Sequence, residues 1–170
     1  VLGLFATTIL ASFWAIFGRI NIEFHYLLLT LNLLIFLKFK DDIFSIYTTC
    51  INELKSLSQS LKYYLAIITL CIIAQCSSIP YVIDNESYYI QTIKWLNEYG
   101  FVKGLVNLHF FLGQVSGWHI TQSALNFSFL YKNFNDLSGF CLLLGNIFAI
   151  QKLNTFFENN DTKYLIVGLF

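Results

Sequence analysis

Two carboxylates at the end of an apolar run are the residues of this chain best placed to do chemistry. Asp84 and Glu86 follow directly on the uncharged run 63–83, and an amphipathic segment, 87–99, comes next. An apolar helix of that length can cross a bilayer, and it would deliver both carboxylates to the membrane surface. There Asp84 could act as the general base that deprotonates an acceptor hydroxyl, with Glu86 orienting a substrate or a divalent cation.

The same two carboxylates also have a purely structural explanation. Asp84 or Asn85 can be the N-cap of the helix predicted for 87–99. Glu86 would then lie in the first turn, near the positive end of the helix dipole. One residue can do both jobs, so helix start and catalytic site stand as alternatives.

The amphipathic segment 87–99 adds a set of aromatic side chains to the carboxylates. Helical periodicity divides it into three stripes, and the pattern predicts a helix that lies along the membrane interface and ends at Gly100. The aromatic rings can bind the C–H faces of a sugar or anchor the helix at headgroup depth. The stripes are aliphatic (Ile90, Ile93, Leu96), aromatic (Tyr88, Trp95, Tyr99) and polar (Gln91, Lys94, Glu98).

Hydrogen-bond donors follow in a segment punctuated by glycine. Lys103, Asn107 and His109 suit a phosphate or a sugar, although a histidine bonded to the backbone is the plainer explanation of His109. A second helix is expected over 118–131. It is unusually polar for a helix that faces lipid, so we expect it to lie in the interface, to re-enter, or to cross while packed against protein, and we favour the first two.

The elements that must position these residues are apolar helices. Hydrophobic residues make up 56% of the chain and charged residues 12%, and the mean hydropathy is +0.63. So little polar surface predicts an all-α membrane protein of multi-pass helices. We expect three spans within 1–82, an outer loop over 83–137 with interfacial or re-entrant helices, and a span with the start of another in 138–170. The predicted spans are 1–17, 24–39, 63–82 and 138–156, with a further run from 164.

Charge and cysteine placement add sidedness and exclude some classes of function. The net charge is zero, which leaves no footprint for nucleic acid. Lysines gather in 38–62, so the positive-inside tendency places that interval, expected to be a loop, in the cytoplasm and 83–137 on the opposite side. Cys71, Cys76 and Cys141 lie in apolar runs without a C-x-x-C spacing, and we expect them to be small buried side chains. The chain has no Met and both ends lie in apolar runs, so we expect it to be part of a longer protein.

The segment 83–113 resembles a known family. It is similar to the first large outer loop of the C-type glycosyltransferase superfamily (GT-C), and most closely to a group of uncharacterised bacterial multi-pass membrane proteins. The elements that carry the likeness are Asp84 with Tyr88, Ile93-Lys94-Trp95, Tyr99-Gly100, Gly104-Leu105, Asn107-Leu108-His109 and Leu112-Gly113.

This resemblance implies an integral-membrane glycosyltransferase of the bacterial inner membrane. Its donor would be a polyprenyl-phosphate sugar, and Asp84 or Glu86 would be the base for attack at the anomeric carbon. Tyr88, Trp95, Tyr99, Lys103, Asn107 and His109 would bind substrate. No cofactor is indicated beyond a divalent cation that Asp84 and Glu86 could hold.

A non-catalytic class competes with the enzyme. The chain could be a membrane assembly module whose 83–137 region docks a partner, or a fragment of a transporter or polysaccharide exporter. A transporter should carry paired ionisable groups near mid-span. Asn32 is the clearest polar residue there, and the polarity is otherwise concentrated in 83–137, which favours surface chemistry or docking.

Overall fold

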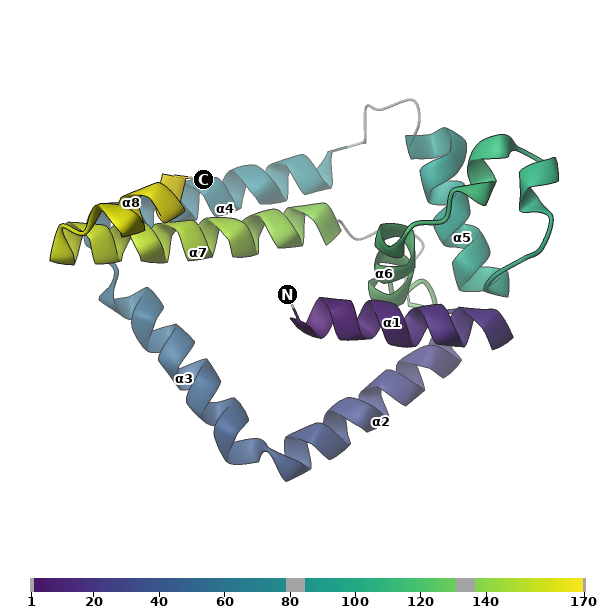
Figure 1. Cartoon of the computed structure of the whole chain (residues 1–170), viewed down its shortest axis with the longest axis horizontal. Coiled ribbons are helices and arrows are strands. Elements are labelled where there is room, and N and C mark those ends of the chain that lie inside the picture. The colour runs from purple at the N-terminus through teal and green to yellow at the C-terminus, as the bar shows by residue number, and fades with distance from the viewer. Residues whose placement is uncertain (1, 79–84, 131–136, 170) are drawn as a thin grey trace. The chain divides into compact units, whose positions relative to one another are not determined.

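The computed structural model describes residues 2–78, 85–130 and 137–169, and these residues contain helices and no strand. The chain divides into two compact units (Figure 1). The first unit comprises Val1–Leu34 and Ile79–Asn135, and the second comprises Ile35–Ser78 and Asp136–Phe170. The prediction of an all-α protein is confirmed for the described residues.

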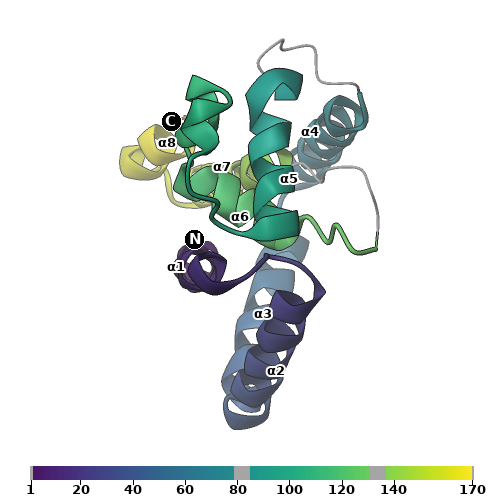
Figure 2. The same ribbon diagram turned by 90° about the vertical axis from the view of Figure 1, so that its right-hand side faces the viewer.

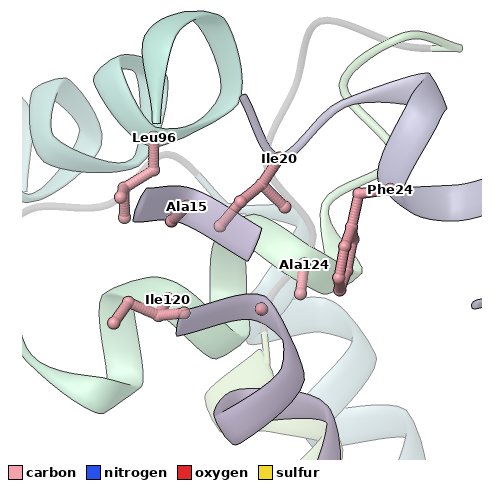
Figure 3. Packing of buried hydrophobic residues seen from close by; sticks show 7 residues of the cluster. Ala15, Ile20, Phe24, Leu96, Ile120 and Ala124 are labelled. Carbon is pink, nitrogen blue, oxygen red and sulfur yellow. The ribbon is translucent and has the colours of Figure 1, made fainter. Parts of the chain in front are cut away.

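The first unit is built on α1, α5 and α6. Its core joins Ala11 and Ala15 of α1 to Leu96 of α5 and to Ile120 and Ala124 of α6, with Ile20 and Phe24 beside them (Figure 3). Alanines let the helix backbones approach closely, so a small core still excludes water. The unit contains α1 (Leu2–Phe17), the first part of α2 (Ile22–Lys38), the π-helix η1 (Asn85–Tyr89), α5 (Ile90–Tyr99), the 3₁₀ turns η2 (Leu105–Asn107) and η3 (Phe110–Gly113), and α6 (Gly117–Leu125).

The C-terminal ends of α1 and α5 meet at a glycine. The Phe101 N–H donates to the Ala15 carbonyl at 2.7 Å, and the Ile20 N–H donates to the Leu96 carbonyl at 2.9 Å. Between these bonds Gly100 has a φ of 75°, and a Cβ there would lie 2.3 Å from the Gly18 carbonyl oxygen. The helix end predicted at Gly100 is confirmed, and the structure adds a second reason for the glycine, because no side chain fits.

The second unit consists of longer helices with little buried surface. It contains the end of α2, α3 (Lys40–Ser56), α4 (Gln59–Ser77), α7 (Leu137–Asn159) and α8 (Thr162–Leu169). α7 lies against both α4 and α8 (Figure 1). Asn154 of α7 accepts a hydrogen bond from the Ser58 N–H at 3.1 Å and donates to Glu158 at 2.8 Å.

Two described helices are long and apolar enough to cross a membrane, α4 and α7. The pair α2 and α3 would add a third as one broken span, and the two helices are bent by 92° at the break between them. The apolar helix α1 is shorter, at 16 residues. The sequence prediction of membrane-spanning helices therefore stands as two or three candidate spans.

Two sequence expectations are corrected by the helices themselves. The interval 38–62, expected to be a loop, contains α3. Asp41 and Asp42 in its first turn and Lys55 in its last turn interact favourably with the helix dipole. The helix expected over 118–131 is the shorter α6. Its nine residues at 1.5 Å each span about 14 Å, less than the roughly 30 Å of a hydrocarbon core.

The cysteine prediction is wrong within the isolated chain. Cys71 and Cys76 are exposed and Cys141 is half-exposed. The reason is that α4 has no buried residue among those described, so small side chains on it are not covered by protein. An uninterrupted apolar run predicts that its side chains are shielded from water. In a candidate membrane span, that shielding does not require neighbouring protein.

Candidate functional site

The two carboxylates are only partly described. Asp84 lies outside the described residues. Glu86 is placed by its backbone alone, in η1. This π-helix runs directly into α5, so the chain is already helical before the segment where the sequence predicted the helix to begin. π-helical turns are rare and often occur at functional sites.

The burial pattern of α5 confirms most of the predicted aliphatic stripe and the polar stripe. Ile93 and Leu96 are buried with Thr92 and Asn97 on the face toward the protein core. Gln91, Lys94 and Glu98 are exposed. The aliphatic stripe packs against this chain's own α6 and core, so burial by protein explains the amphipathic pattern without a lipid surface.

The candidate substrate-binding residues form two groups of rings. In one, Tyr88 stacks on Phe111 with ring centroids 4.9 Å apart and an interplanar angle of 26°, and His109 lies 5.5 Å from the same Phe111 ring. In the other, Trp95 and Tyr99 lie 5.0 Å apart on α5. Phe111 is thus the centre of the first group, and sequence reasoning did not select it because nothing in the spacing connects it to Tyr88.

Lys103 and Asn107 lie in the connection between these rings. Both side chains are exposed, as is that of His109. Gly104 has a φ of 85°, and the Asn107 amide nitrogen would lie 3.4 Å from a Cβ placed on it. The turn predicted here is confirmed, and it leaves these donors available to an anionic ligand.

A cavity of about 360 Å³ lies beneath this connection. That volume is within the range of small-molecule sites. Phe101, Val102 and Val115 contribute to its wall, and the other lining residues come from α5, η2 and η3. They are Thr92, Trp95, Leu96, Gly100, Gly104, Leu105, Val106, Leu112 and Gly113.

A buried polar layer adjoins the core of the first unit, and sequence reasoning noticed only part of it. Asn97, 3% exposed, donates to the Ile20 carbonyl at 2.7 Å and to the Ser123 carbonyl at 3.0 Å. The Thr8 and Thr121 hydroxyls hydrogen-bond between α1 and α6. The unusual polarity predicted to keep α6 out of lipid is explained by this layer, because its polar residues face protein.

His119 is the buried titratable residue of that layer. Its Nδ1 accepts a hydrogen bond from the Ser116 N–H at 3.1 Å, completing a capping box, and its ring lies 5.0 Å from Tyr89. Burial lowers the pKa of this imidazole below its usual 6.5, because the interior disfavours the charged form. His119 is therefore a neutral structural group at pH 7.

Asp84 and Glu86 are the residues for which the sequence predicted a possible divalent-cation site. Within residues 2–78, 85–130 and 137–169, no three His, Cys, Asp or Glu side chains gather as a metal site would require. A divalent cation held by Asp84 and Glu86 stays a prediction.

The fold and the site together define a helical protein with two or three candidate membrane spans and a compact, cavity-bearing unit. The chain belongs to the family described as Domain of unknown function (DUF8201), whose model matches residues 1–170. Neither the comparison with curated proteins nor the comparison with solved structures finds a match.

Proposed function

We propose that this chain is part of an integral-membrane glycosyltransferase of the GT-C kind. It would move a sugar from a polyprenyl-phosphate donor to an acceptor at the outer surface of the bacterial inner membrane, where 83–137 would lie. The observation that supports this most is a convergence of separate segments. Four of the sequence elements that carry the resemblance, those containing Trp95, Gly100, Gly104-Leu105 and Leu112-Gly113, line one cavity.

These elements lie within residues 92–115, and the turns that follow α5 bring them round one space. Here α5, the turn at Gly104 and η3 enclose it together, and Tyr88 and His109 meet at Phe111 close by in the chain. A site that positions a lipid-borne donor needs such convergence, since positioning supplies a large share of catalysis.

The proposed reaction is a single displacement at the anomeric carbon. Asp84 takes the proton from the acceptor hydroxyl, the acceptor oxygen bonds to the anomeric carbon, and the bond from that carbon to the phosphate oxygen breaks. The polyprenyl phosphate leaves with the negative charge. Lys103, with Asn107 and His109, is suited to stabilise that charge because all three donors are exposed on one short connection.

The test is transfer by full-length protein in membranes, with a panel of radiolabelled undecaprenyl-phosphate sugars and endogenous acceptors. Asp84→Asn keeps the shape and the N-cap capacity but removes the basic oxygen, so transfer should fall by roughly a hundredfold to ten-thousandfold. Glu86→Gln tests the other carboxylate. Glu98→Gln, at an exposed position of α5, is the matched control and should retain full activity.

The outcomes separate the alternatives. A dead Glu86→Gln with a normal Asp84→Asn would move the base to Glu86. Normal transfer by both variants would leave the pair as a helix start and contradict the proposed mechanism. No transfer from any donor by the intact protein would favour the membrane assembly module.

A further inference from the structure

We propose that the cavity beneath 101–115 binds the hydrocarbon chain of a membrane lipid. The inference goes beyond sugar transfer, and it would hold if the protein transferred no sugar. It rests on the chemistry of the cavity wall, on the side chains around the cavity, and on the lipid that surrounds a protein with membrane-spanning helices.

The cavity wall presents no charged side chain. Of its lining side chains only Thr92 and Trp95 carry polar groups, and the Thr92 hydroxyl is buried without a hydrogen-bond partner among the described residues. A sugar placed here would leave several hydroxyls without side-chain partners, and each unpaired buried hydroxyl costs stability. A hydrocarbon chain has no such requirement, and it gains free energy for every methylene removed from water.

The connection over the cavity carries exposed apolar side chains beside the exposed polar ones of Lys103, Asn107 and His109. Leu108 is 71% exposed and Phe110 is 67% exposed, and Val106, which lines the cavity, is half-exposed. A cluster of exposed apolar side chains of this kind marks a surface that another apolar phase covers. Leu108 and Phe110 thus add exposed apolar surface to the same connection that contributes Val106 to the cavity wall.

The membrane supplies the ligand. The chain has two or three helices that are able to span a bilayer, so lipid is the apolar phase in its surroundings. A volume of about 360 Å³ holds a stretch of one hydrocarbon chain, and the headgroup of the lipid stays outside. Bulk phospholipid and the polyprenyl donor share this hydrocarbon chemistry, and the experiment distinguishes them.

The test uses Trp95 as the reporter, since its ring lines the cavity. Full-chain protein with Trp14→Phe and Trp118→Phe keeps Trp95 as its single tryptophan, and it is titrated in detergent with phosphatidylcholine that carries brominated acyl chains. Bromine quenches tryptophan fluorescence at close range, so we expect saturable quenching. Undecaprenyl phosphate is the competitor: displacement of the brominated lipid identifies the donor chain as the preferred occupant, and no displacement identifies bulk phospholipid.

Enlarged side chains inside and outside the cavity provide the comparison. Val106→Phe should weaken apparent binding about tenfold, the loss expected when two methylene groups are displaced. Leu108→Phe places the same aromatic side chain at an exposed residue that does not line the cavity, and it should leave binding unchanged. Val102→Phe is the second cavity variant, used where Val106→Phe lowers the melting temperature.

Equal quenching of the cavity variants and Leu108→Phe would overturn the proposal, as would quenching that rises without saturation. Asp84→Asn should bind the brominated lipid normally. A protein that binds lipid but shows no transfer would contradict the proposed function alone, and a protein that transfers sugar without saturable quenching would contradict only this inference.

Discussion

The two units of this chain differ in the side chains that they bury. In the first unit, Asn97 of α5 and Thr121 and Ser123 of α6 are buried beside an alanine-rich core. In the second unit, α3 and α4 bury no residue within the described range, and large side chains such as Leu70 and Ile73 are exposed. Figure 2 gives a second view of the packed helices α5 and α6 of the first unit.

The difference teaches where the specificity of this protein lies. Buried polar groups must be hydrogen-bonded in one geometry, so the first unit is held to a particular arrangement. Helices whose apolar surface is left exposed require an apolar surrounding rather than a particular partner. The first unit is thus the natural place for a site, and the second is suited to a bilayer. Four predictions test this contrast, from the largest expected effect to the smallest.

Gly100→Ala should be the most damaging single change in the first unit. The alanine would occupy a positive φ, which costs roughly 1–2 kcal/mol, and its Cβ would overlap the Gly18 carbonyl, which adds about 1–3 kcal/mol. We expect a loss near 3 kcal/mol, measured by unfolding in detergent. Gly104→Ala is the control: its φ is also positive but its nearest neighbour is a side-chain nitrogen at 3.4 Å, so about 1 kcal/mol should be lost. Equal losses would show that the close approach does not matter.

Asn97→Ala should cost about 2 kcal/mol, because the Ile20 and Ser123 carbonyls would lose a buried donor. The measurement is the same unfolding midpoint. Glu98→Ala, at the exposed neighbouring position, should change stability by less than about 0.5 kcal/mol. If the two variants behaved alike, the buried polar layer would not be what holds the first unit together.

Asn154→Ala tests the second unit and should cost about 1 kcal/mol. It removes the acceptor of the Ser58 N–H, a bond that joins the start of α4 to α7. Asn146→Ala is the matched control on α7, since Asn146 is half-buried and donates only to the Leu142 carbonyl of its own helix among the described contacts. A loss as large as that of Asn97→Ala would remove the contrast between the units.

The smallest effect should be a pH dependence that comes from His119. Burial lowers its pKa, so the unfolded chain binds a proton more readily than the folded chain. The stabilisation is therefore complete above about pH 6.5 and is lost as the pH falls through the lower folded pKa. Melting temperatures in detergent at pH 7.5 and 5.5 should differ for the wild type and differ less for His119→Gln. An unchanged difference in His119→Gln would assign the dependence to other groups.

The sequence alone determined the local structure around the site. Periodicity predicted α5 and its three stripes, Gly100 predicted its end, and the glycine at 104 predicted the turn, because each depends on residues near one another in the chain. It missed α3 because a charged, moderately apolar segment was assigned to a loop on the basis of its lysines. The helix signals, acids in its first turn and a lysine in its last, were present in the same residues.

Only the tertiary structure decided which surfaces the stripes cover and what the side chains enclose. An aliphatic stripe does not specify which surface covers it. From the sequence, Ile93 and Leu96 could be covered by lipid or by α6. The hydrogen bonds of Asn97 to Ile20 and Ser123 join residues that are distant along the chain, and the contact of Tyr88 with Phe111 and the cavity beside Trp95 join separate elements within residues 88–115. The distances between these residues follow from the close packing of whole helices, and no local sequence pattern predicts that packing.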